Sequence, residues 1–228
     1  MRIGLHNASS DYRSGSVELP VQRAVASLMQ PGSIFFDVGA NVGFFTLVAA
    51  GQTDGDATLI AFEPRRDVAD ALAANMRRND LPVSVWPVAV GDQDGVAALL
   101  VAEHPGGATI EPMKAFDTKR IEHVPQVSID SLVESGRVPV PDVVKIDVEG
   151  AEPAVIRGMS QTLRLGRTSV VYEIDAPTGE VAEEQYAEVD ELLDELGYTS
   201  TRLDPSYANT GWHVIHAVAR PDPGDGEG

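Results

Sequence analysis

The chain has 228 residues, no cysteine and a formal net charge of −18 at pH 7. This length suits one α/β domain, and the lack of cysteine excludes disulfides, thiolate zinc sites and cysteine nucleophiles. An acidic surface repels phosphates, so we expect a protein that binds neither nucleic acid nor anionic membranes. No apolar run is long enough to span a bilayer, and we expect a cytoplasmic protein.

Short apolar runs alternate with helical patterns in the first half of the chain. The expected elements, in order, are strand 33–38, helix 43–51, strand 57–63, helix 65–80 and strand 83–90. Pro87 interrupts the last of these strands and indicates a bulge. Residues 95–102 predict an antiparallel addition to the sheet. Residues 103–126 lack a clear period, and we predict an irregular excursion over the functional face of the domain.

The second half of the chain continues the alternation. The expected elements are helix 128–136, strand 142–150, helix 151–164, strand 168–175, helix 183–197 and the strands 198–203 and 212–219. Asp130 is a candidate cap for the first of these helices. The last two strands are close enough in sequence to form an antiparallel pair. We predict a single domain over residues 1–220, followed by a disordered acidic tail over residues 221–228.

Alternating strands and helices predict a mainly parallel α/β sheet with helices on both faces. Ligands of such sheets bind beyond the carboxyl ends of the strands. The residues that follow each strand are therefore the first candidates for a functional site.

A glycine-spaced turn, Gly39, Asn41 and Gly43, follows the first strand directly. Glycine lacks a Cβ, so a ligand can approach the backbone there. A dinucleotide site would show G-x-G-x-x-G, with a pyrophosphate on the next helix N-terminus. Here the turn follows Asp37, whose carboxylate opposes a diphosphate and suits an ammonium or a sulfonium group. S-adenosylmethionine carries both groups and no phosphate.

Carboxylates also follow the next strands. Glu63 ends the second strand about twenty residues after the glycines, where it can accept hydrogen bonds from both hydroxyls of a ribose. Asp92 follows the third strand and is a candidate for the adenine edge, although the surrounding aspartates and glycines favour a plain turn residue. Asp147 and Glu149 follow the fourth strand and would lie over the reacting end of the ligand.

Four segments of the chain resemble the successive motifs of the FkbM-type methyltransferases, a branch of the class I S-adenosylmethionine-dependent enzymes. They are "FFDVGANVGFFTL", "AFEP", "VAVGDQDG" and "VVKIDVEGAEPAVIRGM". The resemblance runs from about Glu18 to Ala219. It implies a Rossmann-like class I methyltransferase fold, with a mainly parallel seven-stranded sheet, an antiparallel C-terminal strand and helices on both faces.

The resemblance also implies roles for the candidate residues. Asp37, Gly39, Asn41 and Gly43 would shape the methionine pocket, and Glu63 would hold the ribose. Asp147 and Glu149 would face the methyl group. The family mostly methylates hydroxyl oxygens, so we expect a small-molecule or glycan hydroxyl as the acceptor.

Two mechanisms could remove the proton of the acceptor hydroxyl. Asp147, Glu149 or a histidine such as His213 would act as the general base. Alternatively, Asp147, Glu149 and Glu173 would hold Mg²⁺, a hard ion that prefers carboxylate ligands and acidifies a bound hydroxyl.

Two departures from the family stand out. Only about thirty residues precede the first strand, which leaves either an open site or a lid from the second subunit of a homodimer. The last strand, "GWHVIHAV", also lacks an asparagine that many relatives have. Two other functions stay open from the sequence: an NAD(P)-dependent oxidoreductase on a similar sheet, and a non-catalytic S-adenosylmethionine-binding protein.

Overall fold

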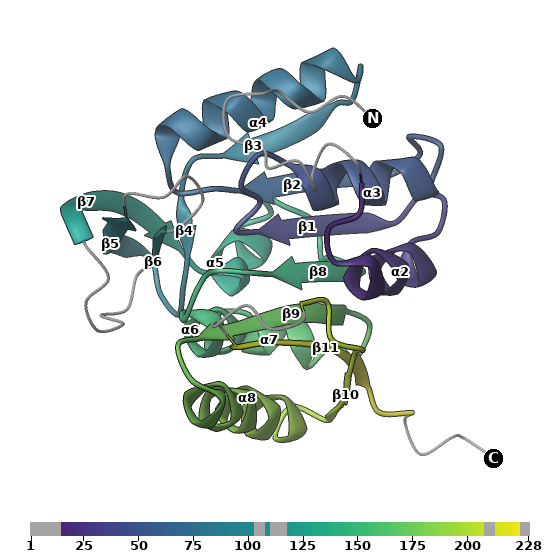
Figure 1. Cartoon of the computed structure of the whole chain (residues 1–228). Helices are drawn as coiled ribbons and strands as arrows, with labels where there is room; N and C mark the ends of the chain where they lie inside the picture. Colours follow the sequence, from purple (N-terminus) through teal and green to yellow (C-terminus); the bar gives the residue numbers. More distant parts are fainter. Residues whose placement is uncertain (1–14, 103–107, 110–117, 208–212, 224–228) are drawn as a thin grey trace.

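A seven-stranded sheet forms the centre of the computed structural model, which describes residues 15–102, 108–109, 118–207 and 213–223 (Figure 1). The strand order is β10-β11-β9-β8-β1-β2-β3. The strands are β1 (Ile34–Val38), β2 (Thr58–Phe62), β3 (Val83–Trp86), β8 (Val143–Ile146), β9 (Ser169–Ala176), β10 (Tyr198–Arg202) and β11 (His213–Pro221). Strand β11 is antiparallel to both of its neighbours, and the other pairs are parallel. The expected mainly parallel sheet with an antiparallel C-terminal strand is confirmed.

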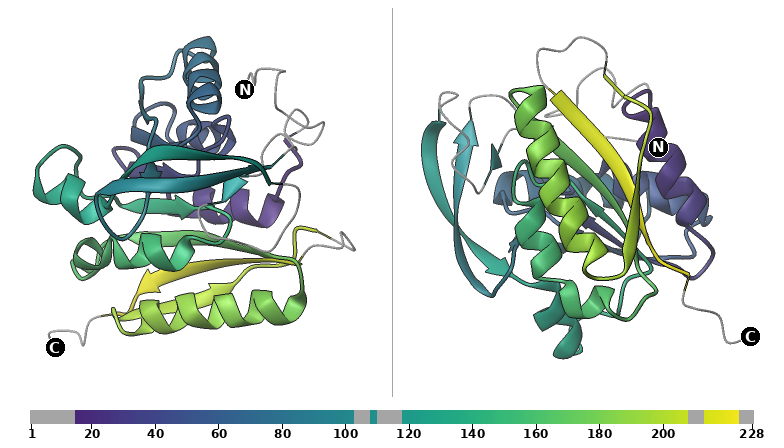
Figure 2. Two further views of the ribbon diagram at one scale, coloured as in Figure 1. Left: turned by 90° about the vertical axis from the view of Figure 1, so that its left-hand side faces the viewer. Right: turned by 90° about the horizontal axis from the view of Figure 1, so that it is seen from below.

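Helices cover both faces of this sheet, as the alternation of strands and helices predicts (Figure 2). One face packs against α2 (Leu19–Leu28), α3 (Phe44–Gln52) and α4 (Arg66–Arg78). The other face packs against α5 (Ile129–Glu134), α6 (Glu152–Arg157), α7 (Ser160–Leu163) and α8 (Gly179–Asp194). Successive strand residues point to opposite faces, so Phe35 lies in the first core and Phe36 in the second.

A second sheet of four strands lies beyond the carboxyl ends of the central parallel strands (Figure 1). Its strands, in the order β4-β7-β5-β6, are β4 (Ala89–Val90), β7 (Thr118–Val127), β5 (Gly95–Ala102) and β6 (Ala108–Thr109). This sheet corrects three expectations. The predicted strand 83–90 breaks at Pro87 into β3 and β4, which belong to different sheets. Residues 95–102 pair with β6 and β7 instead of the main sheet. Residues 118–126 are a strand and not an irregular excursion; residues 103–107 and 110–117 lie outside the described residues.

Three details of the helices also differ from the sequence predictions. Helix α2 was not predicted, although its apolar face packs on the sheet. The predicted helix 151–164 is two short helices, α6 and α7, separated at Gly158. Ser128 caps α5, whereas Asp130 accepts hydrogen bonds from the first turn of α7, at Gln161 and Thr162. The local pattern could not show that contact because it joins residues about thirty positions apart.

The C-terminal strand reaches further than we expected. It ends at Pro221, which we predicted to lie in the tail. Asp222 follows the strand and is bonded beside it: its N–H donates to the carbonyl of Gly197, and its Oδ1 accepts from the hydroxyl of Thr199. Residues 224–228 lie outside the described part of the chain. None of the helices that the structure describes is both long and apolar enough to cross a membrane.

Candidate functional site

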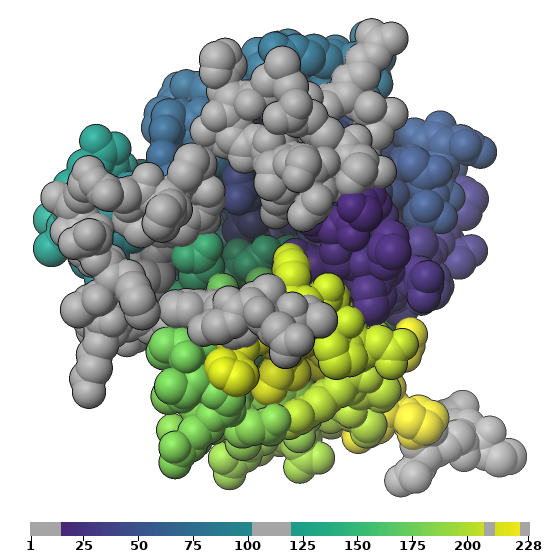
Figure 3. Space-filling model, in the orientation of Figure 1, coloured from purple at the N-terminus to yellow at the C-terminus, as the bar shows by residue number. Residues whose placement is uncertain are grey.

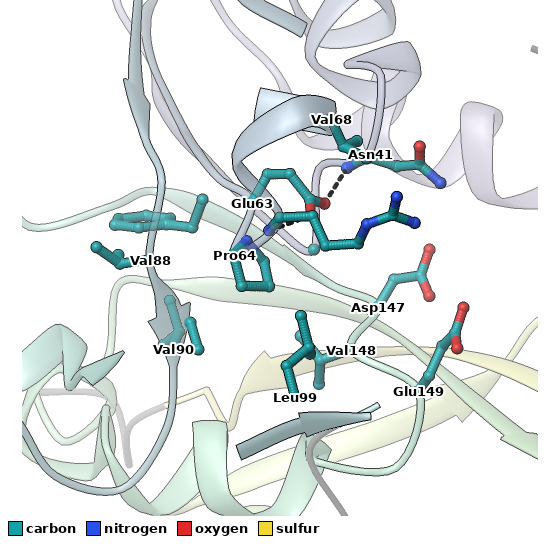
Figure 4. A pocket seen from close by; sticks show the side chains of 14 residues that line it. Asn41, Glu63, Pro64, Val68, Val88, Val90, Leu99, Asp147, Val148 and Glu149 are labelled. Atoms are coloured by element: carbon teal, nitrogen blue, oxygen red, sulfur yellow. Dashed lines mark hydrogen bonds between the residues drawn. The ribbon is translucent and has the colours of Figure 1, made fainter. Parts of the chain in front are cut away.

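Two adjoining pockets lie at the carboxyl ends of β1, β2 and β8, and Gly39, Asn41 and Asp147 line both of them. The first pocket is open to solvent, and the space within it, with the solvent at its mouth included, is about 640 Å³. Its walls combine apolar side chains from both sheets with carboxylates (Figure 4); they include Val68, Val88, Val90, Leu99, Glu63 and Glu149. The second pocket is smaller, about 240 Å³, and is lined by Asp37, Phe45 and Lys145 among others. The site therefore offers an apolar compartment next to a charged one.

The turn after β1 passes very close to another part of the backbone. Gly39 has φ 79°, and a Cβ on it would lie 1.7 Å from the carbonyl oxygen of Asp147. A Cβ on Gly43 would lie 2.6 Å from the methyl carbon of Met76 in α4. We predicted that these glycines make room for a ligand. The structure shows that the lack of a Cβ at these glycines allows close packing within the protein, against the Asp147 carbonyl and the Met76 side chain. Gly39 also lines both pockets.

Glu63, directly after β2, points its carboxylate into the first pocket (Figure 4). The backbone N–H of Asn41 donates to its Oε2 at 3.0 Å, and the N–H of Arg65 donates to its Oε1 at 2.9 Å. Burial raises the pKa of Glu63 to about 7, although both N–H groups oppose that shift. The carboxylate is thus fixed in place, and each oxygen retains acceptor capacity toward the pocket.

A buried lysine organises the charged compartment. Lys145 on β8 binds Asp147 Oδ2 at 2.7 Å, and its ammonium lies 4.5 Å from the centre of the Phe45 ring. Burial lowers the pKa of Lys145, but the carboxylates of Asp147 and Asp37 outweigh that effect and the net shift is upward. Lysine therefore stays charged here and holds Asp147 at the border of both pockets.

Asp37 is buried on the same face of the sheet as Lys145, its partner in the β1–β8 register. The hydroxyl of Thr46 donates to Asp37 Oδ2, whereas Oδ1 has no hydrogen-bond partner among the described residues. Burial raises the pKa of Asp37, and the field of Lys145 only partly offsets this shift. A buried carboxylate oxygen without a donor is costly, so this atom is suited to a cationic ligand.

Glu149 lies on a strained loop at the edge of the first pocket. Its φ of 54° is in the left-handed region, which residues other than glycine, asparagine and aspartate rarely adopt. The buried carboxylate of Glu152 holds this loop by accepting from the N–H groups of Val148 and Gly150. Burial raises the pKa of Glu152 to about 7. Glu152 thus positions the loop that carries Glu149.

Four predicted site residues do not line either pocket: Gly43, Asp92, Glu173 and His213. Asp92 is exposed on the turn before β5. Residues 88–90, which precede it in the chain, line the first pocket instead. His213 is exposed at the start of β11 and lies beside Gly179 of α8. It pairs with Ala176, so strand alternation places it on the opposite face from Lys145 and Asp147.

The predicted Mg²⁺ ligands Asp147, Glu149 and Glu173 do not come together. In the described residues, the group whose ligand atoms lie within 4.8 Å of one another is Glu18, Glu173 and His216. Asp147 forms an ion pair with Lys145, and Glu149 lies on a loop beyond the end of β8. Glu173 instead faces His216, its partner in the β9–β11 register, with Oε2 and Nε2 2.6 Å apart.

The sequence interpretation missed Lys145, Glu18 and His216. Strand periodicity contained a signal for two of them. Lys145 is two residues before Asp147 and therefore on the same face. His216 lies two residues from both Val214 and Val218, so the three share one face of the strand, the face that packs against α2. The pattern does not say which carboxylates His216 contacts. Glu18 precedes a helix that we did not predict.

The sheet order, the single antiparallel strand and the acidic pockets at the strand ends define a class I methyltransferase-type architecture. The chain is similar over 90% of its length to a solved FkbM methyltransferase from Methylobacillus flagellatus, of which it covers 48%, with a TM-score of 0.59 and 16% identity. That likeness supports the fold alone.

Residues 37–200 match the methyltransferase FkbM domain, and the chain belongs to this family. It is 32% identical to the hexuronic acid methyltransferase AglP of Haloferax volcanii over 70% of this chain and 63% of that protein. It is 29% identical to the 31-O-demethyl-FK506 methyltransferase FkbM of Streptomyces tacrolimicus over 83% of this chain and 82% of that protein. The expected family is confirmed.

Proposed function

We propose that this protein is an S-adenosylmethionine-dependent methyltransferase that acts on a hydroxyl oxygen of a small molecule or glycan. The observation that carries the proposal is the fixed, buried carboxylate of Glu63 at the end of β2, in a pocket with apolar walls. A ribose would donate its hydroxyls to this carboxylate. The adenine would lie against apolar side chains such as Val68, Val88 and Leu99.

The second pocket suits the methionine part of the same ligand. Asp37 Oδ1 lacks a donor among the described residues, and the α-ammonium of the ligand would supply one. Gly39 and Asn41 line both pockets, so a ligand that extends from one pocket into the other would contact them along its length. The carboxylates of the two pockets therefore fit a nucleoside with a cationic amino acid chain better than a diphosphate.

When bound, S-adenosylmethionine supplies an electrophilic methyl group on a sulfonium. The acceptor hydroxyl loses its proton as the new C–O bond forms and the C–S bond breaks. Asp147, held in place by the ammonium of Lys145, and Glu149 are the carboxylates at the pocket edge that would take this proton. His213 lies on the other face of the sheet, which removes our reason to assign it this role.

The names of two relatives favour oxygen as the acceptor atom. One is a hexuronic acid methyltransferase, and the other acts on a 31-O-demethyl compound. Sugar acids and FK506 differ greatly in shape, so we transfer to this chain only an oxygen acceptor, and the 31-O-demethyl compound is our reason to propose a hydroxyl. An oxidoreductase is disfavoured because the carboxylates of Asp37, Glu63 and Asp147 would oppose a pyrophosphate.

Calorimetry tests the cofactor assignment. S-adenosylmethionine and S-adenosylhomocysteine should bind the purified protein, and NAD should not. Glu63→Ala should weaken both interactions at least about tenfold, because hydrogen bonds to a charged acceptor contribute about 1.5–3 kcal/mol. The matched control is Glu134→Ala, which removes an exposed carboxylate on α5 and should leave both affinities unchanged. Unchanged binding to Glu63→Ala would refute the ribose assignment.

A second measurement separates an enzyme from a cofactor-binding protein. Transfer of a labelled methyl group to a panel of hydroxylated sugars and macrolides should be detectable with the wild-type protein. Asp147→Asn should lower the rate at least about a hundredfold if this carboxylate is the general base. Turnover that Asp147→Asn does not alter would exclude Asp147 as the base.

A further inference from the structure

Three buried side chains that the proposed methyl transfer does not use converge beside the charged pocket. Glu18 precedes α2, Glu173 lies on β9 and His216 lies on β11; they are 6%, 9% and 3% exposed. His216 Nε2 is 2.6 Å from Glu173 Oε2 and 3.7 Å from Glu18 Oε2. Helix α2 and the C-terminal strands meet on the same side of the molecule in Figure 3, where purple and yellow-green segments are in contact.

Two other atoms of this cluster are held by one short segment. Ser206 Oγ lies 3.3 Å from His216 Nδ1, and the hydroxyl of Tyr207 donates to Glu18 Oε1. With Nδ1–H donating to Ser206, the lone pair of Nε2 would be available to an ion, whereas without an ion the 2.6 Å contact of Nε2 with Glu173 requires a proton between the two atoms. Such outer hydrogen bonds fix the tautomer and the orientation of metal-binding histidines and carboxylates.

One carboxylate oxygen of the cluster lacks a donor. Glu18 Oε2 is buried and has no hydrogen-bond partner among the described residues. Lys145 acts electrostatically on Glu18 and Glu173, but its own hydrogen bond goes to Asp147 and leaves Glu18 Oε2 without a partner among those residues. A buried carboxylate oxygen without a donor is costly, and a bound cation would remove that cost.

Glu18 also has a left-handed backbone, φ 44°, a strained conformation that often accompanies a functional constraint.

We propose that Glu18, Glu173 and His216 form a binding site for a divalent transition-metal ion. One imidazole nitrogen and two carboxylate oxygens suit Zn²⁺ or Mn²⁺. Ligand atoms around such an ion are roughly 3 Å apart when the bonds are about 2.1 Å long. The distances from His216 Nε2 to the two carboxylate oxygens, 2.6 and 3.7 Å, bracket that value, so small side-chain rotations would admit the ion.

The site adjoins the proposed methyl-transfer centre. Ile146 and Tyr172 are the last paired residues of β8 and β9, and Asp147 and Glu173 follow them on the same face of the sheet. Asp147 borders both pockets. The metal site is nevertheless independent of the cofactor proposal, because it uses none of the residues assigned to the nucleoside.

Binding of Mn²⁺ and Zn²⁺ to the full chain, dialysed against chelator and tested without cofactor, examines the proposal directly. We expect one ion per chain by calorimetry, and an immobilised Mn²⁺ signal by electron paramagnetic resonance. Glu18→Gln and Glu173→Gln should each weaken binding at least about tenfold, since each removes a charged ligand. Glu149→Gln is the matched control: it removes a carboxylate of the same pocket region that is not a proposed ligand, and should bind the ion like the wild type.

Two results would overturn the metal site. One is the absence of stoichiometric binding by folded wild-type protein at millimolar Mn²⁺ and Zn²⁺. The other is binding that Glu18→Gln and Glu173→Gln leave intact. If these variants do not fold, anomalous diffraction from a Zn²⁺-soaked wild-type crystal decides the matter: a peak between the three ligand atoms supports the site, and a peak elsewhere or none contradicts it. S-adenosylhomocysteine affinity, measured separately, tests the cofactor proposal without reference to the metal.

Discussion

Single residues at the strand ends bring distant parts of the backbone together at the candidate site. Gly39 allows the turn after β1 to contact the carbonyl of Asp147, and the N–H of Asp147 in turn donates to Val38. Asn41 adopts φ 47° and directs its own N–H at Glu63. The shape of the pockets therefore depends on backbone positions as much as on the carboxylates that line them.

Replacement of Gly39 by alanine should be strongly destabilising. Its Cβ would overlap a carbonyl oxygen that cannot rotate away, and the positive φ adds about 1–2 kcal/mol. We expect a loss of about 3 kcal/mol or more in the free energy of unfolding, measured by urea denaturation. Gly51→Ala is the control: Gly51 lies in α3 with nothing within 4 Å of its Cβ position, and the change should stabilise by about 0.5 kcal/mol. Wild-type stability of Gly39→Ala would disprove the close approach.

Short helices on the α8 side of the sheet depend on capping contacts between elements. Helix α7 has only four residues and no side-chain cap at its own N-cap position. Asp130, in the first turn of α5, accepts from the N–H groups of Gln161 and Thr162 and from the hydroxyl of Thr162. One carboxylate thus joins α5 to α7.

Removal of this carboxylate tests that connection. Asp130→Ala should lower the free energy of unfolding by about 1–2 kcal/mol, because it leaves the first turn of α7 without acceptors. Ser128→Ala removes the cap of α5 and should cost about 1 kcal/mol, which gives a reference for an ordinary cap. If Asp130 only interacted with the dipole of its own helix, its loss would cost less than Ser128→Ala. Urea denaturation of the two variants distinguishes these cases.

Across the whole molecule, buried carboxylates couple stability to pH. The pKa of Glu63 and that of Glu152 are each raised by burial to about 7, and that of Asp175 to about 8. In the unfolded chain these groups lose their protons near pH 4. Between about pH 4.5 and 7 the folded protein therefore holds more protons than the unfolded chain, and its stability falls as the pH rises.

We expect the cofactor-free protein to be more stable at pH 5 than at pH 7.5, by up to about 3 kcal/mol for each of Glu63 and Glu152. Urea denaturation at both values, in 0.5 M NaCl to screen the surface charge, measures this difference. The double variant Glu63→Gln, Glu152→Gln should show a shallower dependence on pH. A stability that rises from pH 5 to 7.5, or an equal slope in the double variant, would contradict the assigned shifts.

Periodicity and turn chemistry identified most of the central sheet, the long helices and the carboxylates that follow β1, β2 and β8. These features are local: an apolar strand, a glycine turn and the acid beside it are neighbours in the chain, so the pattern reports them directly. Strand β7 was missed because it has no distinctive pattern of its own and is defined by its pairing with β5. Helix α2 was missed although Val21, Ala24 and Val25 recur at helical spacing.

Which side chains meet across the sheet required the folded structure. The face on which a residue lies follows from strand alternation, but its neighbour depends on strand order and register, which long-range packing sets. Register opposes Glu173 to His216 and Asp37 to Lys145, and helix packing adds Glu18. The chain alone thus specifies that acids lie at the strand ends. Three-dimensional packing selects which of them surround the lysine and which face the histidine, because those contacts join residues far apart in sequence.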